Sequence, residues 1–191
     1  MTSKKRVVLI TGAESGIGKS TSKIFLDNGY KVICTYLKNN NNKNTKDIEY
    51  HRIDITKNKD WENLALYIKK KFKKIDVLVN SAGVRLSGNL ETTSMSDWSY
   101  HLNNNVTGTF LACKYILPFL KKAKNSSIIN VASINSIRGA KNMLAYATSK
   151  SAIISFTASL ALDLTKNKIR VNAVAPGAIE TPMLASFKKD L

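Results

Sequence analysis

The chain of 191 residues contains only two cysteines and two histidines. Cys34 and Cys113 each lie inside an apolar segment without a cysteine or histidine at metal-ligand spacing, so we interpret both as small buried hydrophobic residues. His51 and His101 also lack ligand spacing and are interpreted as structural. The sequence therefore predicts no metal site, and its low cysteine content fits the reducing cytoplasm.

Long hydrophobic runs are also missing. The longest apolar stretch, TGTFLACKYILPFL at 107–120, is interrupted by Lys114 and Pro118, so no membrane-spanning helix is predicted. Near the start, the run VVLI ends at Thr11 and Gly12, which is too short for the core of a signal peptide. A cytoplasmic protein without a membrane partner is the expectation.

Acidic residues are scarce: 13 Asp and Glu stand against 30 Lys and Arg, for a net charge of +17. Such an excess can indicate binding to nucleic acid. However, the lysines form small scattered groups, and aromatic residues do not alternate with them as a base-stacking surface requires. Together with the asparagine run at 39–42, this pattern is typical of a compositional bias, and we expect no nucleic-acid partner.

Short apolar segments alternate with amphipathic ones along the chain. Strands are predicted at 5–11, 31–36, 49–55, 75–80, 127–133 and 169–175. Helices are predicted at 16–28, 60–72, 97–121 and 144–165, the first with Ile17, Thr21, Ile24 and Phe25 on its apolar face and the third kinked or ended by Pro118. The alternation indicates an α/β fold, a doubly wound parallel sheet with helices on both faces. The length suits one domain.

Small and polar residues follow the predicted strands. The first strand leads into TGAESGIG at 11–18, whose glycines permit a tight turn and whose helix start offers free N–H groups to a phosphate. NSAG at 80–83 follows the fourth strand, Ser133 ends the fifth, and PG at 176–177 follows the sixth. These strand ends meet at one edge of a parallel sheet, where such folds bind ligands.

The segment YATSK places Tyr146 and Lys150 four residues apart on one helix face. Taken alone, this spacing is as typical of a solvated polar pair as of a proton donor beside a cation. A free tyrosine has a pKa of about 10, and a neighbouring cation lowers it. The pair therefore indicates a catalytic site only in combination with the glycine turn and Ser133.

In joint order and spacing, these segments resemble the single-domain type of the short-chain dehydrogenase/reductase family, from TGAESGIG to PGAIETPM. The resemblance implies one NAD(P)-binding Rossmann-type domain over residues 1–191, with strand order 3-2-1-4-5-6. It implies an oxidoreductase that moves a hydride between nicotinamide and a ketone or secondary alcohol. The implied catalytic residues are Asn105, Ser133, Tyr146 and Lys150; Asn105 is preferred to its neighbours because the family's VTGTF context follows it.

In the resembled mechanism, Tyr146 exchanges a proton with the substrate oxygen and Ser133 hydrogen-bonds that oxygen, so both bind substrate. Lys150 also holds the nicotinamide ribose, and Asn105 holds a water. The implied cofactor-binding residues come from every strand end: Gly12, Ser15, Gly16, Ile17, Gly18, Tyr36, Lys38, Asp54, Ile55, Asn80, Ala82, Gly83, Tyr146, Lys150, Pro176, Gly177, Ile179 and Thr181. Ser81 departs from the family's NNAG turn.

The sequence favours NADP(H), with NAD(H) open as the alternative. Tyr36 occupies the place where an NAD-preferring enzyme usually carries a carboxylate, and Lys38 follows two residues later. Ser15 is a counter-signal, because NADP-preferring relatives often have a basic residue there.

The resemblance leaves the substrate open between a 3-oxoacyl-carrier-protein and a small alcohol or sugar; acyl carrier protein is an expected partner for a basic surface. The family continues for several tens of residues beyond PGAIETPM, so the chain is expected to be truncated and to lack the C-terminal edge strand. A homodimer is expected rather than a tetramer. The alternative is an inactive or incomplete dinucleotide-binding fragment without turnover.

Overall fold

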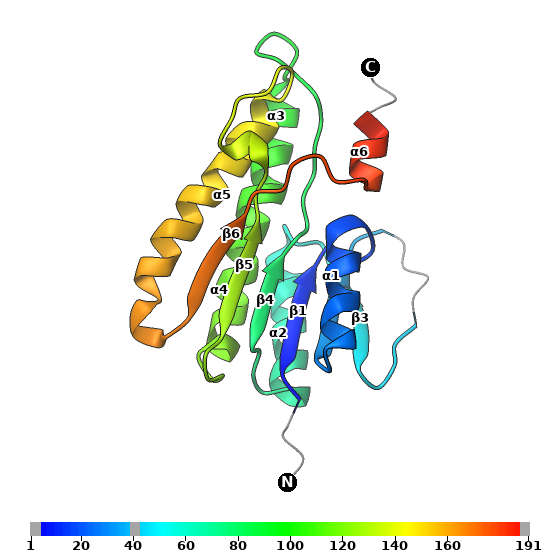
Figure 1. Cartoon of the computed structure of the whole chain (residues 1–191), viewed down its shortest axis with the longest axis vertical. Helices are drawn as coiled ribbons and strands as arrows, with labels where there is room; N and C mark the ends of the chain where they lie inside the picture. Colours follow the sequence, from blue (N-terminus) through cyan, green and yellow to red (C-terminus); the bar gives the residue numbers. More distant parts are fainter. Residues whose placement is uncertain (1–4, 39–42, 188–191) are drawn as a thin grey trace.

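The structure, a computed structural model, describes residues 5–38 and 43–187; the asparagine run at 39–42 and the lysines at 188–189 lie outside this part. It confirms the predicted fold class: a six-stranded sheet with the order β3-β2-β1-β4-β5-β6, in which every neighbouring pair is parallel (Figure 1). The strands are β1 (Val7–Thr11), β2 (Lys31–Tyr36), β3 (Ile48–Arg52), β4 (Val77–Asn80), β5 (Ser127–Val131) and β6 (Arg170–Val174).

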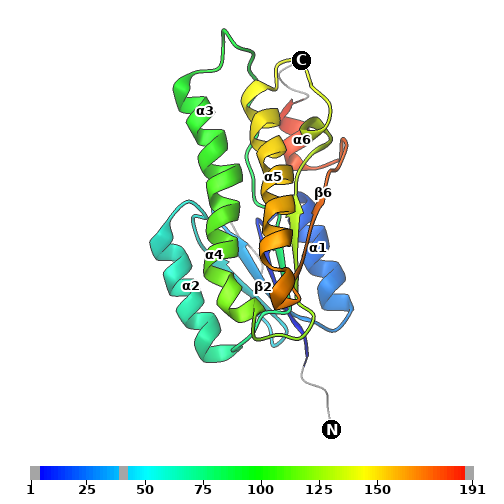
Figure 2. The same cartoon turned by 90° about the vertical axis from the view of Figure 1, so that its left-hand side faces the viewer.

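Helices cover both faces of the sheet. Helix α1 lies on one face, and α2, α4 and α5 lie on the other (Figure 2). The longer helical segments are α1 (Gly16–Asp27), α2 (Asn58–Lys71), α3 (Met95–His101), η1 (Leu102–Thr107), α4 (Gly108–Leu120) and α5 (Leu144–Asp163); the short ones are η2 (Ile134–Ser136), η3 (Thr165–Asn167) and α6 (Pro182–Phe187). Among the described residues, none of the helices combines the length and apolarity needed to cross a bilayer.

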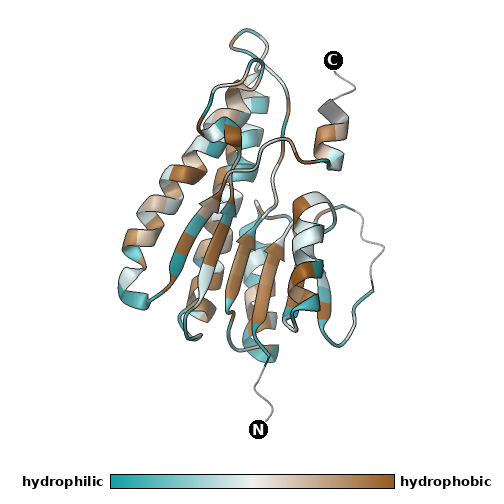
Figure 3. Ribbon diagram, in the orientation of Figure 1, coloured by the Kyte–Doolittle hydropathy of each residue, from teal (hydrophilic) through white to brown (hydrophobic). Residues whose placement is uncertain are grey.

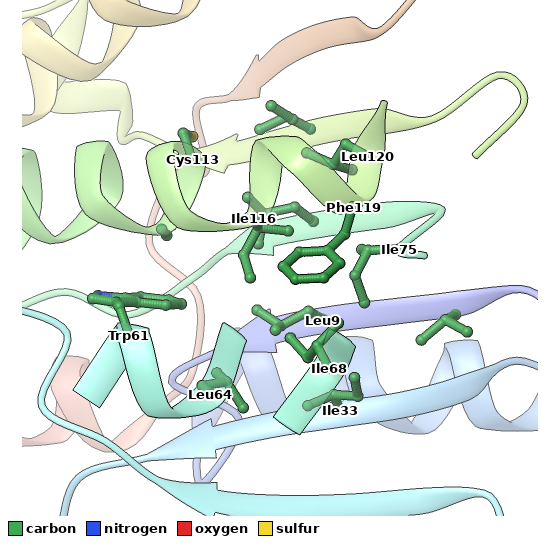
Figure 4. Close-up of a cluster of buried hydrophobic side chains, with 14 of the residues drawn as sticks. Leu9, Ile33, Trp61, Leu64, Ile68, Ile75, Cys113, Ile116, Phe119 and Leu120 are labelled. Atoms are coloured by element: carbon green, nitrogen blue, oxygen red, sulfur yellow. The ribbon is translucent and has the colours of Figure 1, made fainter. Parts of the chain in front are cut away.

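The two-sided cover explains why the central strands are apolar throughout. All five residues of β1 are buried, and the middle strands are coloured as hydrophobic in Figure 3. Between the sheet and α2 and α4, Trp61 and Ile68 pack with Leu9 of β1 and Ile116 of α4 (Figure 4). The Trp61 indole donates a hydrogen bond of 2.9 Å to the Ile55 carbonyl. This core therefore fixes the segment that follows β3.

The apolar face predicted for helix α1 packs on the sheet only in part. Phe25 of that face, with Leu26, packs against the core of β1 and β2, whereas Ile24 is 62% exposed. The most buried positions are Gly18 and Ser22. A Cβ on Gly18 would lie 2.3 Å from the Gly12 carbonyl oxygen, so the start of the helix lies directly against the glycine turn.

The helix predicted at 97–121 is interrupted. Between α3 and α4 the chain forms η1, a π-helical segment, and this widened turn contains the buried Asn105. Such segments are rare and often lie at functional sites. Pro118 lies in the last turn of α4, which continues to Leu120, so the proline neither ends nor interrupts the helix before that residue. The short helix α6 has no counterpart in the sequence-based prediction.

Both cysteines are buried free thiols, as predicted from their apolar surroundings. Burial raises the pKa of Cys34 and of Cys113 to about 12. Both thiols therefore stay protonated at neutral pH, a form that is a poor nucleophile.

Candidate active site

A cleft of about 480 Å³ opens across the carboxyl ends of the strands. Most residues predicted from the sequence to bind cofactor or substrate line it. These are Gly12, Ser15, Gly16, Ile17, Tyr36, Ile55, Ala82, Gly83, Ser133, Tyr146, Lys150, Pro176, Gly177, Ile179 and Thr181. The topology explains the gathering, because all strands are parallel and their carboxyl ends therefore share one edge.

The glycine turn forms one wall of the cleft. Gly12 and Gly16 have φ values of +65° and +50°, which L side chains rarely adopt. A Cβ on Gly12 would lie 2.7 Å from Ala82 Cα, so the turn after β1 touches the turn after β4. The Thr11 hydroxyl fixes that contact by accepting hydrogen bonds of 3.0 Å from the backbone N–H groups of Ser81 and Ala82.

This wall fits a dinucleotide. Gly12 and Gly16 both line the cleft and present bare backbone there, and the N–H groups of the first turn of α1 have no partner within the helix. A helix start of this kind favours a bound phosphate group. Gly18 does not line the cleft; it serves the close packing of α1 described above.

Ser133 lies just beyond β5 and is buried. It caps the short helix η2: its hydroxyl oxygen accepts a hydrogen bond of 3.2 Å from Asn135 N–H, and its own N–H donates to the Ser136 hydroxyl at 3.1 Å. The reciprocal cap holds the Ser133 side chain in one place at the cleft. Its hydroxyl hydrogen remains available as a donor toward the cleft.

Tyr146 and Lys150 come from the first turns of α5, and both line the cleft. Lys150 is buried, and its Nζ donates a hydrogen bond of 2.7 Å to the Val131 carbonyl. Burial lowers the pKa of Lys150 from 10.5 to about 8. Tyr146 is 8% exposed, and its ring meets the edge of the buried His101 ring with the centroids 6.3 Å apart.

Asn105 lies behind the cleft rather than on its surface. Its amide Nδ2 donates to the Val84 carbonyl at 3.0 Å and to the Ser149 hydroxyl at 2.9 Å, and its Oδ1 accepts from Val84 N–H at 2.8 Å. Gly83 separates it from the cleft: a Cβ there would lie 3.0 Å from Asn105 Oδ1 and 3.3 Å from Lys150 Nζ. Asn105 and Lys150 therefore meet at Gly83.

Besides Gly18, three residues predicted to bind cofactor are not part of the cleft lining. The Asn80 amide points into the core, donating to Asn130 Oδ1 at 2.9 Å and to Cys113 Sγ at 3.4 Å. Asp54 accepts hydrogen bonds from the backbone and hydroxyl of Thr56 and so closes a local turn. Lys38 is exposed, and none of the three lines the cleft.

Several residues that line the cleft were not predicted from the sequence. They include Glu14, Leu37, Val84, Arg85, Asn104, Met143, Met183 and Leu184. Most lie in connecting segments whose path no periodic pattern reveals. Glu14 is the exception, because it is part of the glycine turn itself and could have been considered with it.

Residues 6–191 match the family model of the short chain dehydrogenases. The chain belongs to the short-chain dehydrogenase family. As a member, it is an NAD(P)-dependent oxidoreductase. It is 37% identical over 186 residues to the 3-oxoacyl-(acyl-carrier-protein) reductase FabG of Thermotoga maritima, covering 93% of this chain and 76% of the relative.

Solved structures of the family superpose closely on this short-chain dehydrogenase. ElxO with NADP bound has a TM-score of 0.87 at 32% identity, covering 98% of this chain and 79% of that chain. A short chain dehydrogenase from Leptospira borgpetersenii with bound NAD+ has a TM-score of 0.86 at 30% identity, covering 92% and 72%. Both forms of the dinucleotide therefore occur among similar structures, and the comparisons give no support to an inactive fragment.

Proposed function

We propose that this short-chain dehydrogenase interconverts a ketone and a secondary alcohol, with Tyr146 as the acid–base residue. The observation that carries the proposal is the meeting of Ser133, Tyr146 and the buried cation Lys150 in one cleft beside a glycine turn suited to a dinucleotide. The catalytic residues are therefore Ser133, Tyr146 and Lys150, with Asn105 as the residue that positions them.

Each side chain has a separate task. The Ser133 hydroxyl donates a hydrogen bond to the substrate carbonyl oxygen and stabilises the charge that develops on it. Tyr146 gives its phenolic proton to that oxygen during reduction and removes it again during oxidation. The bound nicotinamide dinucleotide supplies or accepts the hydride. Reduction therefore leaves Tyr146 as a phenolate that must be stabilised and reprotonated.

Lys150 stabilises that phenolate. Its pKa of about 8 leaves most of the side chain protonated at neutral pH. Because Lys150 is buried, its charge is weakly screened by water and acts strongly on groups near it. The hydrogen bond from Nζ to the Val131 carbonyl ties the ammonium to the end of β5, next to the turn that carries Ser133.

Asn105 contributes indirectly, because its side chain holds the Val84 backbone in place. Both hydrogens of its amide are used, on the Val84 carbonyl and the Ser149 hydroxyl. One further acceptor position remains on Oδ1, which already accepts from Val84 N–H, and a water bound there would lie close to Gly83 and Lys150. We propose that this position binds the water that the family resemblance implies for Asn105, and that the water connects Lys150 to solvent.

Apolar side chains make up much of the cleft lining. Val84, Ile134, Met143, Met183 and Leu184 line the cleft, together with the basic residues Arg85 and Lys141. An apolar substituent on the carbonyl compound would pack against the apolar part of this lining. A 3-oxoacyl compound is one such substrate, which the name of the Thermotoga relative supports, and the net charge of +17 would favour approach of an acidic carrier protein.

Two finer expectations concern cofactor and assembly. The preference for NADP(H) expected from the sequence keeps only one of its two arguments, the tyrosine Tyr36 in place of an acidic residue, because Lys38 does not line the cleft. A homodimer is supported by apolar side chains on the outer helices, with Phe110 of α4 exposed by 46% and Leu162 of α5 by 79%. Light scattering in solution would test the dimer, and a monomer at micromolar concentration would contradict it.

The function is tested by assaying a panel of ketones with both dinucleotides and following nicotinamide absorbance. The panel should include 3-oxoacyl thioesters, cyclic ketones and aldose-derived substrates. We expect turnover of at least one apolar ketone and its loss in Ser133→Ala. Tight dinucleotide binding without turnover of any substrate would instead support a binding protein without catalysis.

A further inference from the structure

Glu14 extends from the glycine turn to the end of β2. Its Oε1 accepts a hydrogen bond of 3.3 Å from the backbone N–H of Leu37, the residue after the last position of β2. It lines the cleft beside Thr35, Tyr36 and Leu37. The glycine turn thus places a carboxylate at the end of β2, where β2 itself carries no acidic residue.

The second oxygen of this carboxylate is buried and finds no hydrogen-bond partner within residues 5–38 and 43–187. This oxygen is closed to solvent, so a ligand in the cleft does not reach it. Oε1, whose bond to Leu37 N–H is exposed, keeps a further acceptor position, and a hydroxyl of a ligand in the cleft can donate to it.

The position of the carboxylate indicates which ligand group it meets. In dinucleotide-binding folds, an acidic residue about 20 positions beyond the glycine turn, at the end of the second strand, accepts hydrogen bonds from the adenosine ribose hydroxyls. The same charge repels the 2′-phosphate that distinguishes NADP from NAD. In this chain Tyr36 occupies that position, and the Glu14 side chain bonds the backbone immediately after it.

We propose that Glu14 recognises the 2′-hydroxyl of the adenosine ribose and makes this enzyme selective for NAD(H). The inference rests on the proposed function, since it assumes that the cleft binds a nicotinamide dinucleotide. It reverses the preference for NADP(H) drawn from the sequence. That preference assumed that a carboxylate could reach the end of β2 only from β2 itself.

Basic residues near this end of the cleft do not cancel the carboxylate. Arg52 uses its Nε to donate a hydrogen bond of 3.1 Å to the Leu37 carbonyl, and Lys38 is exposed. Neither lines the cleft, whereas Glu14 does. A 2′-phosphate bound beside Tyr36 would therefore lie next to the negative side chain of Glu14, and like charges repel.

Direct binding tests the proposal without relying on catalysis. Dissociation constants of NAD+ and NADP+ would be measured by isothermal titration calorimetry for the wild type, for Glu14→Gln and for Glu180→Gln. Glutamine keeps an oxygen for Leu37 N–H but removes the charge. Glu180 is an exposed acidic residue between two cleft-lining residues that does not itself line the cleft, so it controls for a general loss of negative charge.

We expect the wild type to bind NAD+ at least about tenfold more tightly than NADP+, and Glu14→Gln to tighten NADP+ binding by about tenfold or more. Glu180→Gln should leave the ratio within about twofold. A wild type that prefers NADP+, or a ratio unchanged in Glu14→Gln, would overturn the role of Glu14 while leaving the proposed oxidoreductase function intact. Failure of both dinucleotides to bind would overturn both proposals.

Discussion

The Asn105 side chain binds the backbone of Val84 through both of its polar groups, with Nδ2 donating to the carbonyl at 3.0 Å and Oδ1 accepting from the N–H at 2.8 Å. This pairing joins the π-helical segment η1 to the turn after β4. A third bond, from Nδ2 to the Ser149 hydroxyl at 2.9 Å, extends the link to α5. One buried amide thus holds together three segments that line or support the cleft.

Replacing Asn105 by alanine should therefore destabilise the fold. The substitution leaves the partly buried N–H and carbonyl of Val84 without this partner, whereas the Ser149 hydroxyl keeps its bond to the Tyr146 carbonyl. A fully buried unsatisfied group costs about 1–3 kcal/mol, and partly buried ones cost less. We expect a total loss of about 2–4 kcal/mol by urea unfolding. Asn104→Ala is the matched control, because its amide makes one exposed bond to the Tyr100 carbonyl. Equal losses in both variants would show that the Asn105 network is not structural.

At Gly12, the stability effect of the close contact with Ala82 can be measured separately from the effect of the positive φ. Gly12 and Gly29 both have positive φ, +65° and +79°. A Cβ on Gly12 would meet Ala82 backbone at 2.7 Å, whereas one on Gly29 would have nothing within 4 Å in the described part of the chain. Gly29→Ala should therefore cost about 1–2 kcal/mol from conformation alone.

Gly12→Ala should cost more than this and should weaken dinucleotide binding by about tenfold or more, because the turn after β4 must move. Thermal unfolding of both variants measures the loss of stability, and calorimetric titration measures the loss of dinucleotide affinity. Similar stability and affinity in the two variants would contradict a direct role for the Gly12–Ala82 contact.

Burial of Lys150 should make stability depend on pH in a defined direction. Its pKa falls from 10.5 to about 8 on folding, so between these values the unfolded state binds more protons and stability rises with pH. The cost of the buried charge is fully present below about pH 8, where it amounts to up to about 3 kcal/mol. The cost disappears above pH 10.5.

Lys150→Met isolates the pH dependence that Lys150 causes, because the variant and the wild type have every other titrating group in common. At pH 7 the variant loses the hydrogen bond to Val131 but no longer buries a charge, so we expect its stability to equal or exceed that of the wild type. This advantage should shrink toward pH 10. Turnover should be lost in the variant. A stability difference that does not change between pH 7 and pH 10 would show that Lys150 is not buried as a charge.

The sequence predicts the fold well because two-sided burial makes each strand an apolar run and because parallel strands need helical crossovers. It also places Tyr146 and Lys150 on one helix face, since residues four apart are neighbours on any helix. The π-helical segment at Asn105 is different. Its buried Asn105 makes long-range bonds to Val84 and Ser149, which no local pattern reveals.

Side-chain direction at strand ends was the weak point of the prediction. Leu78 packs in the core beneath α2 and α4, and Asn80, two residues later, points to the same side of β4, away from the cleft. Both faces of the strand are apolar, so the sequence offers no alternation from which to read the direction. Glu14 lies in the glycine turn that the sequence reveals, but the direction of its side chain depends on a contact with Leu37, 23 residues away.

The central claim is that Tyr146 exchanges the proton with substrate. The most direct test compares Tyr146→Phe with the wild type and with Tyr100→Phe, a change at a tyrosine that does not line the cleft. Turnover and the dissociation constant of the dinucleotide would be measured on the same preparations. We predict that Tyr146→Phe binds the dinucleotide within about twofold of wild type and loses turnover by about 10²–10⁴-fold, while Tyr100→Phe changes neither. Near-normal turnover in Tyr146→Phe would contradict the account.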